Sequence, residues 1–308
     1  MRVFVAGATG AIGRPLVSQL LAAGHEVTGM TRSPQGAEGI RAAGAEAVVS
    51  DVFDADGVRG AIAEARPEAV VHQLTDLPAD YDTNPARLAR GTNRLRREGT
   101  RILLDAAQAA GARRFVAQSL AFVYEPEGDW VKDEEAPLAN APEGAVASVR
   151  ALEQAVLEAP GLEGIVLRYG QFYGPGTWYA ADGSIAEQVR RRRFPIVGRG
   201  EGRFSFIHVE DAAAATVAAV ERGRPGIYNV CDDEPAPMRE WLPAYAQALG
   251  AKPPRRVPTL LARMVAGATA AQAATGMRGA ANGKAREELA WSPRYPSWRE
   301  GFRGSLGA

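Results

Sequence analysis

The chain begins MRVFVAGATGAIGRPLV (residues 1–17), and this stretch predicts how the polypeptide starts to fold. A short run with the pattern of a buried strand leads into three regularly spaced glycines, and an apolar run at helical spacing follows. In such a unit the backbone comes close to a phosphate, whose charge meets free N–H groups and the positive end of the helix. We therefore expect Gly7, Gly10 and Gly13 to form a phosphate-binding turn. The alternative is a tight turn whose glycines serve only close packing.

The composition excludes several kinds of partner. With 36 basic and 36 acidic residues, the chain has no net charge to attract nucleic acid or an anionic membrane. One cysteine, Cys231, cannot form an internal disulfide, and three histidines give no zinc pattern, so no metal site is predicted. The chain shows neither a cleavable signal nor a membrane-spanning run. We expect a cytoplasmic protein that acts on a small molecule.

Strands and helices alternate along the first half of the sequence. The segments LLAAG, IRAAG and AQAAG end at Gly24, Gly44 and Gly111, where a helix needs a left-handed residue before the next strand. Apolar runs at 69–74 and 164–170 have the pattern of further buried strands. Because parallel strands need long crossovers, the pattern predicts an α/β fold of the Rossmann type, a doubly wound parallel sheet.

The alternation loosens after residue 173, which predicts a second, smaller lobe. We expect residues 1–173 to form the dinucleotide-binding domain and 204–232 to return to it, because the strand-like GIYNVC (226–231) interrupts the later segments. Residues 174–203 and 233–308 would then form a substrate-binding lobe.

The end of the second predicted strand favours one cofactor over another. An NAD-selective site places a carboxylate there for the ribose 2′-hydroxyl, whereas this chain has GMTRSP. Arg32 is suited to pair with a 2′-phosphate, and Thr31 or Ser33 can add hydroxyl donors, so NADP(H) is predicted in preference to NAD(H). Arg32 as an exposed loop charge is the alternative. After the third strand, Asp51 is suited either to accept a bond from the adenine amine or to cap a helix.

Taken together, these residues resemble the extended short-chain dehydrogenase/reductases, the NAD-dependent epimerase/dehydratase group. The resemblance covers nearly the whole chain and rests on eight segments in order, which are GATGAIG (7–13), SDVFD (50–54), TNRLRREGTRILLDAA (92–107), RRFVAQSLAFVY (113–124), LRYGQFYGPG (167–176), FIHVEDAA (206–213), YNVCDDEP (228–235) and KAREELAWSP (284–293). It implies a Rossmann domain that binds NAD(P) and a C-terminal lobe that covers the substrate.

The resemblance also implies which residues surround the cofactor. They are Thr9, Ala11 and Ile12 with the glycines at the pyrophosphate, Val52 at the adenine, Gln73 and Leu74 after the fourth strand, Asn93 on a helix, and the segment from Tyr169 through Gln171 to Phe172 near the nicotinamide.

The family's catalytic triad does not carry over. The place of its Ser or Thr is taken by Leu120, with Ser119 one step away on the other side of a strand. Its Tyr-x-x-x-Lys precedes a helical glutamate that resembles Glu153, and counting back gives Ala145 and Val149. Neither side chain can transfer a proton or bind the ribose. The chain is thus expected to be an atypical member without the Ser/Tyr/Lys triad.

Another group would then donate the proton to a developing alkoxide. Tyr124, at the carboxyl edge of the sheet, is one candidate, and Ser119 and Tyr169 are two more. For each tyrosine a packed ring with a satisfied hydroxyl is the alternative. His72 is expected to be a structural histidine bonded to backbone, and His208 is expected to tie a strand to the next helix.

These observations favour an NADP(H)-dependent oxidoreductase that acts on a carbonyl/alcohol pair with a non-standard proton donor. Two other hypotheses stay open: an epimerase, dehydratase or cyclase that uses bound NAD(P), and a non-catalytic NADP(H)-binding sensor or partner subunit. The substrate is either a sugar nucleotide or an apolar or aromatic molecule. A homodimer through helices around 85–110 and 142–159 is common in the family.

Overall fold

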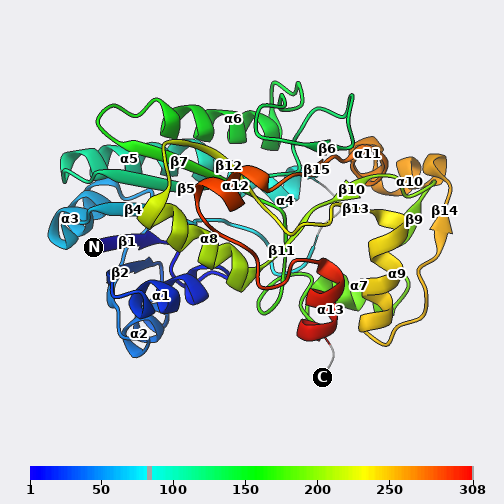
Figure 1. Cartoon of the computed structure of the whole chain (residues 1–308), viewed down its shortest axis with the longest axis horizontal. Helices are drawn as coiled ribbons and strands as arrows, with labels where there is room; N and C mark the ends of the chain where they lie inside the picture. The colour runs from blue at the N-terminus through cyan, green and yellow to red at the C-terminus, as the bar shows by residue number, and fades with distance from the viewer. Residues whose placement is uncertain (82–84, 307–308) are drawn as a thin grey trace.

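The main sheet of the molecule has seven parallel strands. In Figure 1 it lies on the side of the N-terminus, and the helices from the later part of the chain lie to its right. The computed structural model describes residues 1–81 and 85–306. Within the sheet the strand order is β12-β7-β5-β4-β1-β2-β3. The strands are β1 (Arg2–Ala6), β2 (Glu26–Thr31), β3 (Glu46–Val49), β4 (Ala69–His72), β5 (Arg114–Leu120), β7 (Glu163–Tyr169) and β12 (Gly226–Val230). This order, which runs outward in both directions from β1 and β4, confirms the predicted Rossmann-type fold.

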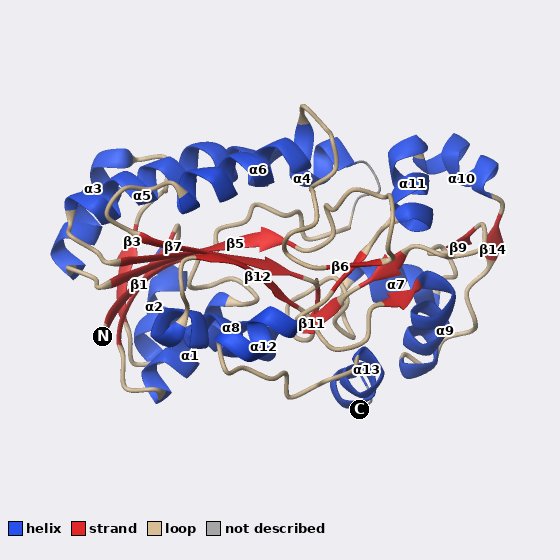
Figure 2. Ribbon diagram, turned by 45° about the horizontal axis from the view of Figure 1, so that its top comes forward, coloured by secondary structure: helices blue, strands red, loops and turns tan. Residues whose placement is uncertain are grey.

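Helices cover both faces of the sheet, and Figure 2 shows the two layers. One face carries α1 (Gly13–Ala22), α2 (Pro34–Ala42), α8 (Val209–Arg222) and α12 (Gly283–Glu288). The other carries α3 (Ala55–Ala65), α4 (Pro85–Arg94), the π-helix η1 (Leu95–Gly99), α5 (Thr100–Ala109) and α6 (Gly144–Leu157). Each layer buries an apolar core against valine-rich strands, which is why those strands are apolar on both sides.

The glycine signals in the sequence mark real helix ends. Gly24, Gly44 and Gly111 have φ angles of +80°, +95° and +71°, so each adopts the left-handed conformation predicted for it. The strand predicted at 226–231 is β12, and it joins the main sheet beside β7 in parallel register. These predictions are confirmed.

A second apolar core lies beside the sheet and is rich in aromatic rings, including Trp241, Trp298 and Phe206. Its helices are α7 (Ser184–Arg190), α9 (Met238–Ala248), α10 (Thr259–Ala266), α11 (Ala268–Gly276) and α13 (Trp298–Leu306). The remaining short strands form two-stranded pairs: β6 (Val131–Lys132) with β15 (Gly279–Ala280), β8 (Gln171–Tyr173) with β11 (Phe206–His208), β9 (Ile196–Val197) with β14 (Arg256–Val257), and β10 (Arg203–Phe204) with β13 (Ala236–Pro237). No helix among the described residues is long and apolar enough to cross a membrane.

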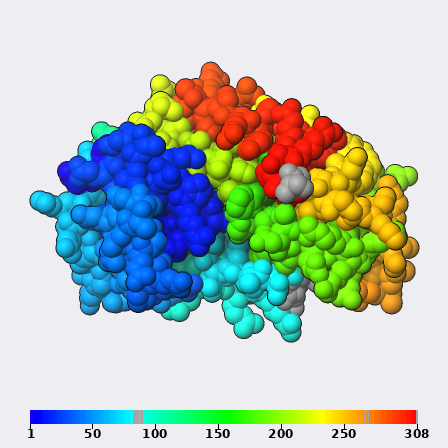
Figure 3. All heavy atoms as spheres, turned by 90° about the horizontal axis from the view of Figure 1, so that it is seen from below, coloured from blue at the N-terminus to red at the C-terminus, as the bar shows by residue number. Residues whose placement is uncertain are grey.

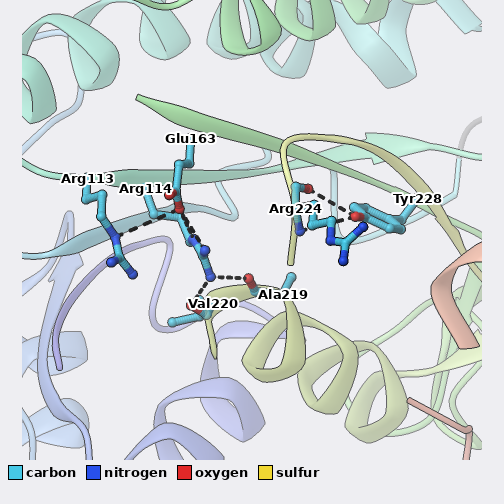
Figure 4. Close-up of polar contacts among 7 residues, drawn as sticks. All are labelled: Arg113, Arg114, Glu163, Ala219, Val220, Arg224 and Tyr228. Atoms are coloured by element: carbon cyan, nitrogen blue, oxygen red, sulfur yellow. Dashed lines mark hydrogen bonds and ion pairs between the residues drawn. The ribbon is translucent and has the colours of Figure 1, made fainter. Parts of the chain in front are cut away.

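A buried arginine joins the sheet to α8, as Figure 4 shows. Arg114, at the start of β5, donates to Glu163 on β7 with its Nη2 at 2.7 Å from the carboxylate. Its Nη1 donates to the carbonyls of Ala219 and Val220 in the last turn of α8. The Ala219 carbonyl also accepts from the N–H of Gly223, the residue that caps the end of α8. Arg114 adds a second donor to it and supplies one to the Val220 carbonyl, so it fixes the end of α8 against the sheet.

We expect Arg114→Met to lower the free energy of unfolding by about 3 kcal/mol, because it removes a buried donor from the Val220 and Ala219 carbonyls and the nearest cation from Glu163. Arg113→Met is the matched control, since Arg113 is 64% exposed and its Nε lies 3.9 Å from the same carboxylate. Urea denaturation of both variants measures the difference. Equal losses in the two variants would show that the contacts to α8 contribute nothing.

Candidate dinucleotide-binding site

The glycine-rich loop after β1 is so crowded that two of its positions exclude any side chain. A Cβ on Gly7 would lie 2.8 Å from the backbone carbon of Gln73, and Gly7 has a φ of +94°. A Cβ on Gly13 would lie 2.1 Å from the carbonyl oxygen of Gly7. At Gly10 the nearest atom is 3.4 Å away, which is ordinary contact. Gly7 and Gly13 are therefore required by packing, whereas the protein itself leaves room at Gly10.

The loop presents unpaired backbone donors at the start of α1. Among the described residues, the N–H groups of Thr9, Ala11 and Ile12 have no backbone acceptor outside regular elements. The first turn of α1 carries no acidic residue that would compete for an anion. Free N–H groups at a helix N-terminus bind phosphate, so the loop fits the pyrophosphate of a dinucleotide. The loop also borders the second lobe, since Gly176 lies beside Ala11, and Figure 3 shows the dark blue N-terminal surface next to green surface from the middle of the chain.

The residues predicted to meet the adenosine half follow the neighbouring strands β2 and β3. Arg32 is exposed and lies 3.8 Å from Asp76, a loose pair that leaves the guanidinium free to move. Ser33 caps α2, and its hydroxyl accepts from the N–H of Gly36. Asp51 accepts from the N–H of Phe53 and is not the helix cap that we considered, because Asp54 caps α3.

Val52 is buried and lies beside Gly99 and Leu95, the last and first residues of η1. Strands β2 and β3 run parallel to β1, so Arg32, Ser33, Asp51 and Val52 all lie at the carboxyl edge where the glycine-rich loop begins.

The residues predicted near the nicotinamide half follow β4 and β7. Gln73 is buried, its amide donates to Tyr169 at 3.1 Å, and its Oε1 has no partner among the described residues. Leu74 donates its N–H to the Nδ1 of His72. An unpaired buried oxygen beside the loop is a polar group that a ligand can satisfy. The unpaired N–H groups of the glycine-rich loop, the free Oε1 of Gln73 and the space that the glycines leave together fit a nicotinamide dinucleotide.

Asn93 and the β8 residues complete the predicted set. Asn93 is buried on α4, and its Oδ1 accepts from Ser148 at 2.8 Å and from Arg96 at 3.3 Å. Gln171 and Phe172 are half-buried on β8, which pairs with β11. The structure therefore spreads the predicted cofactor residues along one edge of the sheet, from β3 across β1 to β7.

Two of the predicted proton donors belong to a buried polar network. Glu153 on α6 receives both a hydrogen bond from Ser119 and a bidentate pair from Arg168 at 2.7 and 2.8 Å. Arg168 also donates to the hydroxyl of Tyr124, which donates to Asn229 at 2.6 Å. Burial opposes the charge of Arg168, but the bonds to Glu153 outweigh it and raise the pKa of the guanidinium. Sequence reasoning missed this pair, although an arginine inside an apolar strand run is a signal for one.

The three hydroxyls predicted as proton donors are all buried. Tyr124 is 4% exposed, and burial, only partly opposed by Arg168, raises the pKa of its hydroxyl to about 12. Ser119 is sealed against Glu153. Tyr169 is fully buried, donates to Thr216 at 2.6 Å and has a pKa raised to about 12 by burial. All three hydroxyls have hydrogen-bond partners within the protein, and their roles as proton donors stay predictions.

Both histidines behave as the sequence indicated. His72 is buried, and burial lowers the pKa of its ring to about 4, with the charge of Arg96 acting in the same direction. Its Nδ1 accepts from backbone, so its Nε2 donates to Thr100 at 3.1 Å. His208 caps α8 by accepting from the N–H of Glu210. Among the described residues no group of His, Cys, Asp and Glu side chains is arranged to hold a metal ion.

The fold and the phosphate-binding loop define a Rossmann-type dinucleotide-binding protein. A model of the NAD dependent epimerase/dehydratase family matches residues 3–231. The chain therefore belongs to this family, as its sequence segments indicated.

Three similar proteins narrow the class further. The chain is 50% identical over 307 residues to a 3-diazoavenalumate denitrifying reductase of a Streptomyces species, covering 98% of this chain and 99% of the relative. The UDP-glucose 4-epimerase of Thermus thermophilus, solved with NAD, is 27% identical with a TM-score of 0.73, covering 99% and 98% of the two chains. A human epimerase family protein solved with NADPH shares the fold at 21% identity, with a TM-score of 0.77 over 99% of both chains. The chain is an NAD(P)-dependent oxidoreductase with a nicotinamide dinucleotide cofactor.

We expect Gly10→Ala to keep the fold and to weaken dinucleotide binding, because only a ligand needs the space that a methyl group would fill there. Gly13→Ala should instead lower the melting temperature, since its Cβ would collide with the Gly7 carbonyl. Thermal melts with and without NADPH distinguish the two effects. Gly39→Ala, with nothing within 4 Å of the added Cβ, is the control. Unimpaired NADPH binding by the Gly10 variant would remove the loop from the site.

Proposed function

We propose that this protein is an NADPH-dependent reductase that replaces a diazonium group by hydrogen and releases dinitrogen. The substrate class is an unsaturated diazonium compound that also carries a carboxylate. The relative that is 50% identical is named for a diazo acid and for a denitrifying reduction, and it matches this chain from end to end. The carbonyl substrate expected from the family stays a prediction that no contact in the site favours.

The observation that carries this proposal is that apolar side chains occupy the positions where the family has its proton-transfer groups. Leu120, Ala145 and Val149 stand where the resemblance places the triad, and Val149 is fully buried on α6. The nearby hydroxyls of Ser119 and Tyr124 are held by Glu153, Asn229 and Arg168. Reduction of a carbonyl develops an alkoxide that needs a donor. Because the described residues at these positions offer no free proton donor, they suit a reaction that develops no alkoxide.

Loss of dinitrogen meets that condition. When bound, NADPH supplies a hydride, so that R–N₂⁺ becomes R–H while the C–N bond breaks, N₂ leaves with its electron pair, and NADP⁺ remains. Atoms and charges balance without any added proton. A diazo group on a saturated carbon would need a proton as well, so the donor-free site favours a diazonium on an unsaturated carbon. The residues of the chain need only bind, orient and exclude water.

The preference for NADPH rests on the end of β2. No carboxylate follows Thr31, and Arg32 is held only by a loose, exposed pair with Asp76. A 2′-phosphate offers Arg32 a charge-assisted partner, and the N-terminus of α2 adds the backbone donors of its first turn. NADPH is therefore the proposed cofactor, and Arg32 the residue that selects it.

The intact protein should bind NADPH more tightly than NADH, and Arg32→Ala should narrow that preference by about 1 to 3 kcal/mol through loss of a charge-assisted bond. Calorimetric titration with each nucleotide measures it. Arg59→Ala on α3, an equally exposed arginine, is the control that should change neither affinity. Equal affinities of the intact protein for the two nucleotides would contradict the assignment.

The reaction itself is tested with 4-carboxybenzenediazonium and stereospecifically deuterated NADPH, compared with a reaction lacking protein. We expect N₂ release above the uncatalysed rate, benzoate as product, and deuterium at the carbon that lost nitrogen from one of the two C4-deuterated forms. In D₂O with unlabelled NADPH the product should contain no deuterium at that carbon. Deuterium taken from D₂O, or a product that retains nitrogen, would overturn the proposal. Steady NADPH consumption also excludes a sensor and a cofactor used only transiently.

Three remaining predictions belong to the same proposal. We place the protein in the reducing cytoplasm, which is supported by the free, buried thiol of Cys231 and by the need for NADPH. We also propose that residues 174–203 and 233–308 cover the substrate and that α4, η1, α5 and α6 form the interface of a homodimer. Light scattering in solution measures the mass of the assembly.

A further inference from the structure

Arg96 is a buried arginine without a carboxylate partner among the described residues. Arg96 lies in η1 and is 7% exposed. Its Nη1 donates to the Oδ1 of Asn93 at 3.3 Å, a neutral acceptor that Ser148 already uses. Its Nε and Nη2 have no acceptor among the described residues, and neither is sealed from solvent. Within residues 1–81 and 85–306 Arg96 forms no ion pair, in contrast to the buried Arg168 with its carboxylate Glu153.

A buried charge of this kind is costly. Burial lowers the pKa of the Arg96 guanidinium to about 10, and the more distant charge of Glu153 only partly opposes this. At neutral pH the group thus keeps its charge and three or more unused N–H donors. Buried charges in proteins are paired or bind a ligand. The unused donors therefore indicate a partner that is not part of this chain.

The position of Arg96 indicates which partner. Four residues after it, Thr100 begins α5 and accepts from His72, the last residue of β4. Because α5 leads back to the start of β5, which is parallel to β4, the residues before Thr100, Arg96 among them, lie toward the carboxyl edge of the sheet. Ligands of open parallel sheets bind at this edge. Gln73, with its unpaired Oε1, follows His72 directly.

Arg96 is also close to the place of the missing family lysine. Asn93 connects it to Ser148 on α6, and Ser148 precedes Val149, where the resemblance places the lysine that holds the ribose. Val149 has no charge where the family has a lysine. Arg96, in the neighbouring segment η1, supplies a positive charge to the same region.

We propose that Arg96 is a cofactor-binding residue whose guanidinium holds the nicotinamide half of the dinucleotide, through the ribose hydroxyls and the phosphate attached to them. This inference deepens the proposed function and rests on its cofactor, but it is independent of the diazonium substrate. The unpaired cation of the free protein becomes paired when the dinucleotide binds.

Binding of NADPH and of 2′,5′-ADP tests the assignment, because 2′,5′-ADP contains only the adenosine half. We expect Arg96→Met to weaken NADPH binding about 10- to 100-fold and to change 2′,5′-ADP binding less than about twofold. Arg96→Lys should recover part of the loss. Arg97→Met, the exposed neighbour on the same turn, should change neither ligand. Undiminished NADPH binding, or equal loss of both ligands, would overturn the proposal.

The melting temperature without ligand separates a binding role from a structural one. Removal of an unpaired buried charge should leave the melting temperature of Arg96→Met at or above that of the unsubstituted protein, while the added stabilisation by NADPH falls. A lower melting temperature without ligand would show that Arg96 holds the fold together. Because no substrate enters either measurement, failure of the diazonium reaction leaves the result unaffected, and failure here leaves the reaction test standing.

Discussion

The close approach of the first loop to β4 constrains the rest of the site. Gly7 passes so near the backbone of Gln73 that no side chain fits between them, and Gly13 lies against Gly7 in turn. This packing aims the start of α1 and its unpaired N–H groups at the carboxyl edge of the sheet. The parallel order of β1, β2 and β4 then brings the segments after each strand to the same edge. A dinucleotide site follows from topology before any catalytic side chain is considered.

The polar groups near that edge divide into those that the protein satisfies and those that it leaves open. Glu153, Arg168, Tyr124 and Ser119 satisfy one another, which explains why their hydroxyls are poor candidates for chemistry. The Oε1 of Gln73 and the guanidinium of Arg96 are left open. An enzyme whose reaction needs a hydride but no proton can use such open groups to bind its ligands. It does not need a free proton donor.

The sequence was sufficient for the fold because backbone signals determine it. Glycines at helix ends and valine-rich strands were readable one segment at a time, and the return of β12 to the sheet was visible as an isolated apolar run. Side-chain direction was harder. Tyr169 lies on the same face of β7 as Leu167 and Ile165, because side chains alternate along a strand. Its ring therefore packs into the core beneath α1 and α8.

Contacts between side chains on different helices and strands could not be predicted from the sequence. No local pattern shows that Arg168 meets Glu153 on a helix, or that Arg96 is buried among several exposed arginines. Both features depend on how α6 and η1 pack on the sheet, which no short segment of sequence encodes.

The central claim is that this site delivers hydride without a proton donor of its own. Its most direct test is the single-turnover rate of NADPH oxidation by 4-carboxybenzenediazonium, measured in H₂O and in D₂O between pH 5 and 7. The account predicts the same rate in both solvents and no change with pH. A slower rate in D₂O together with a titrating group in the pH profile would contradict it.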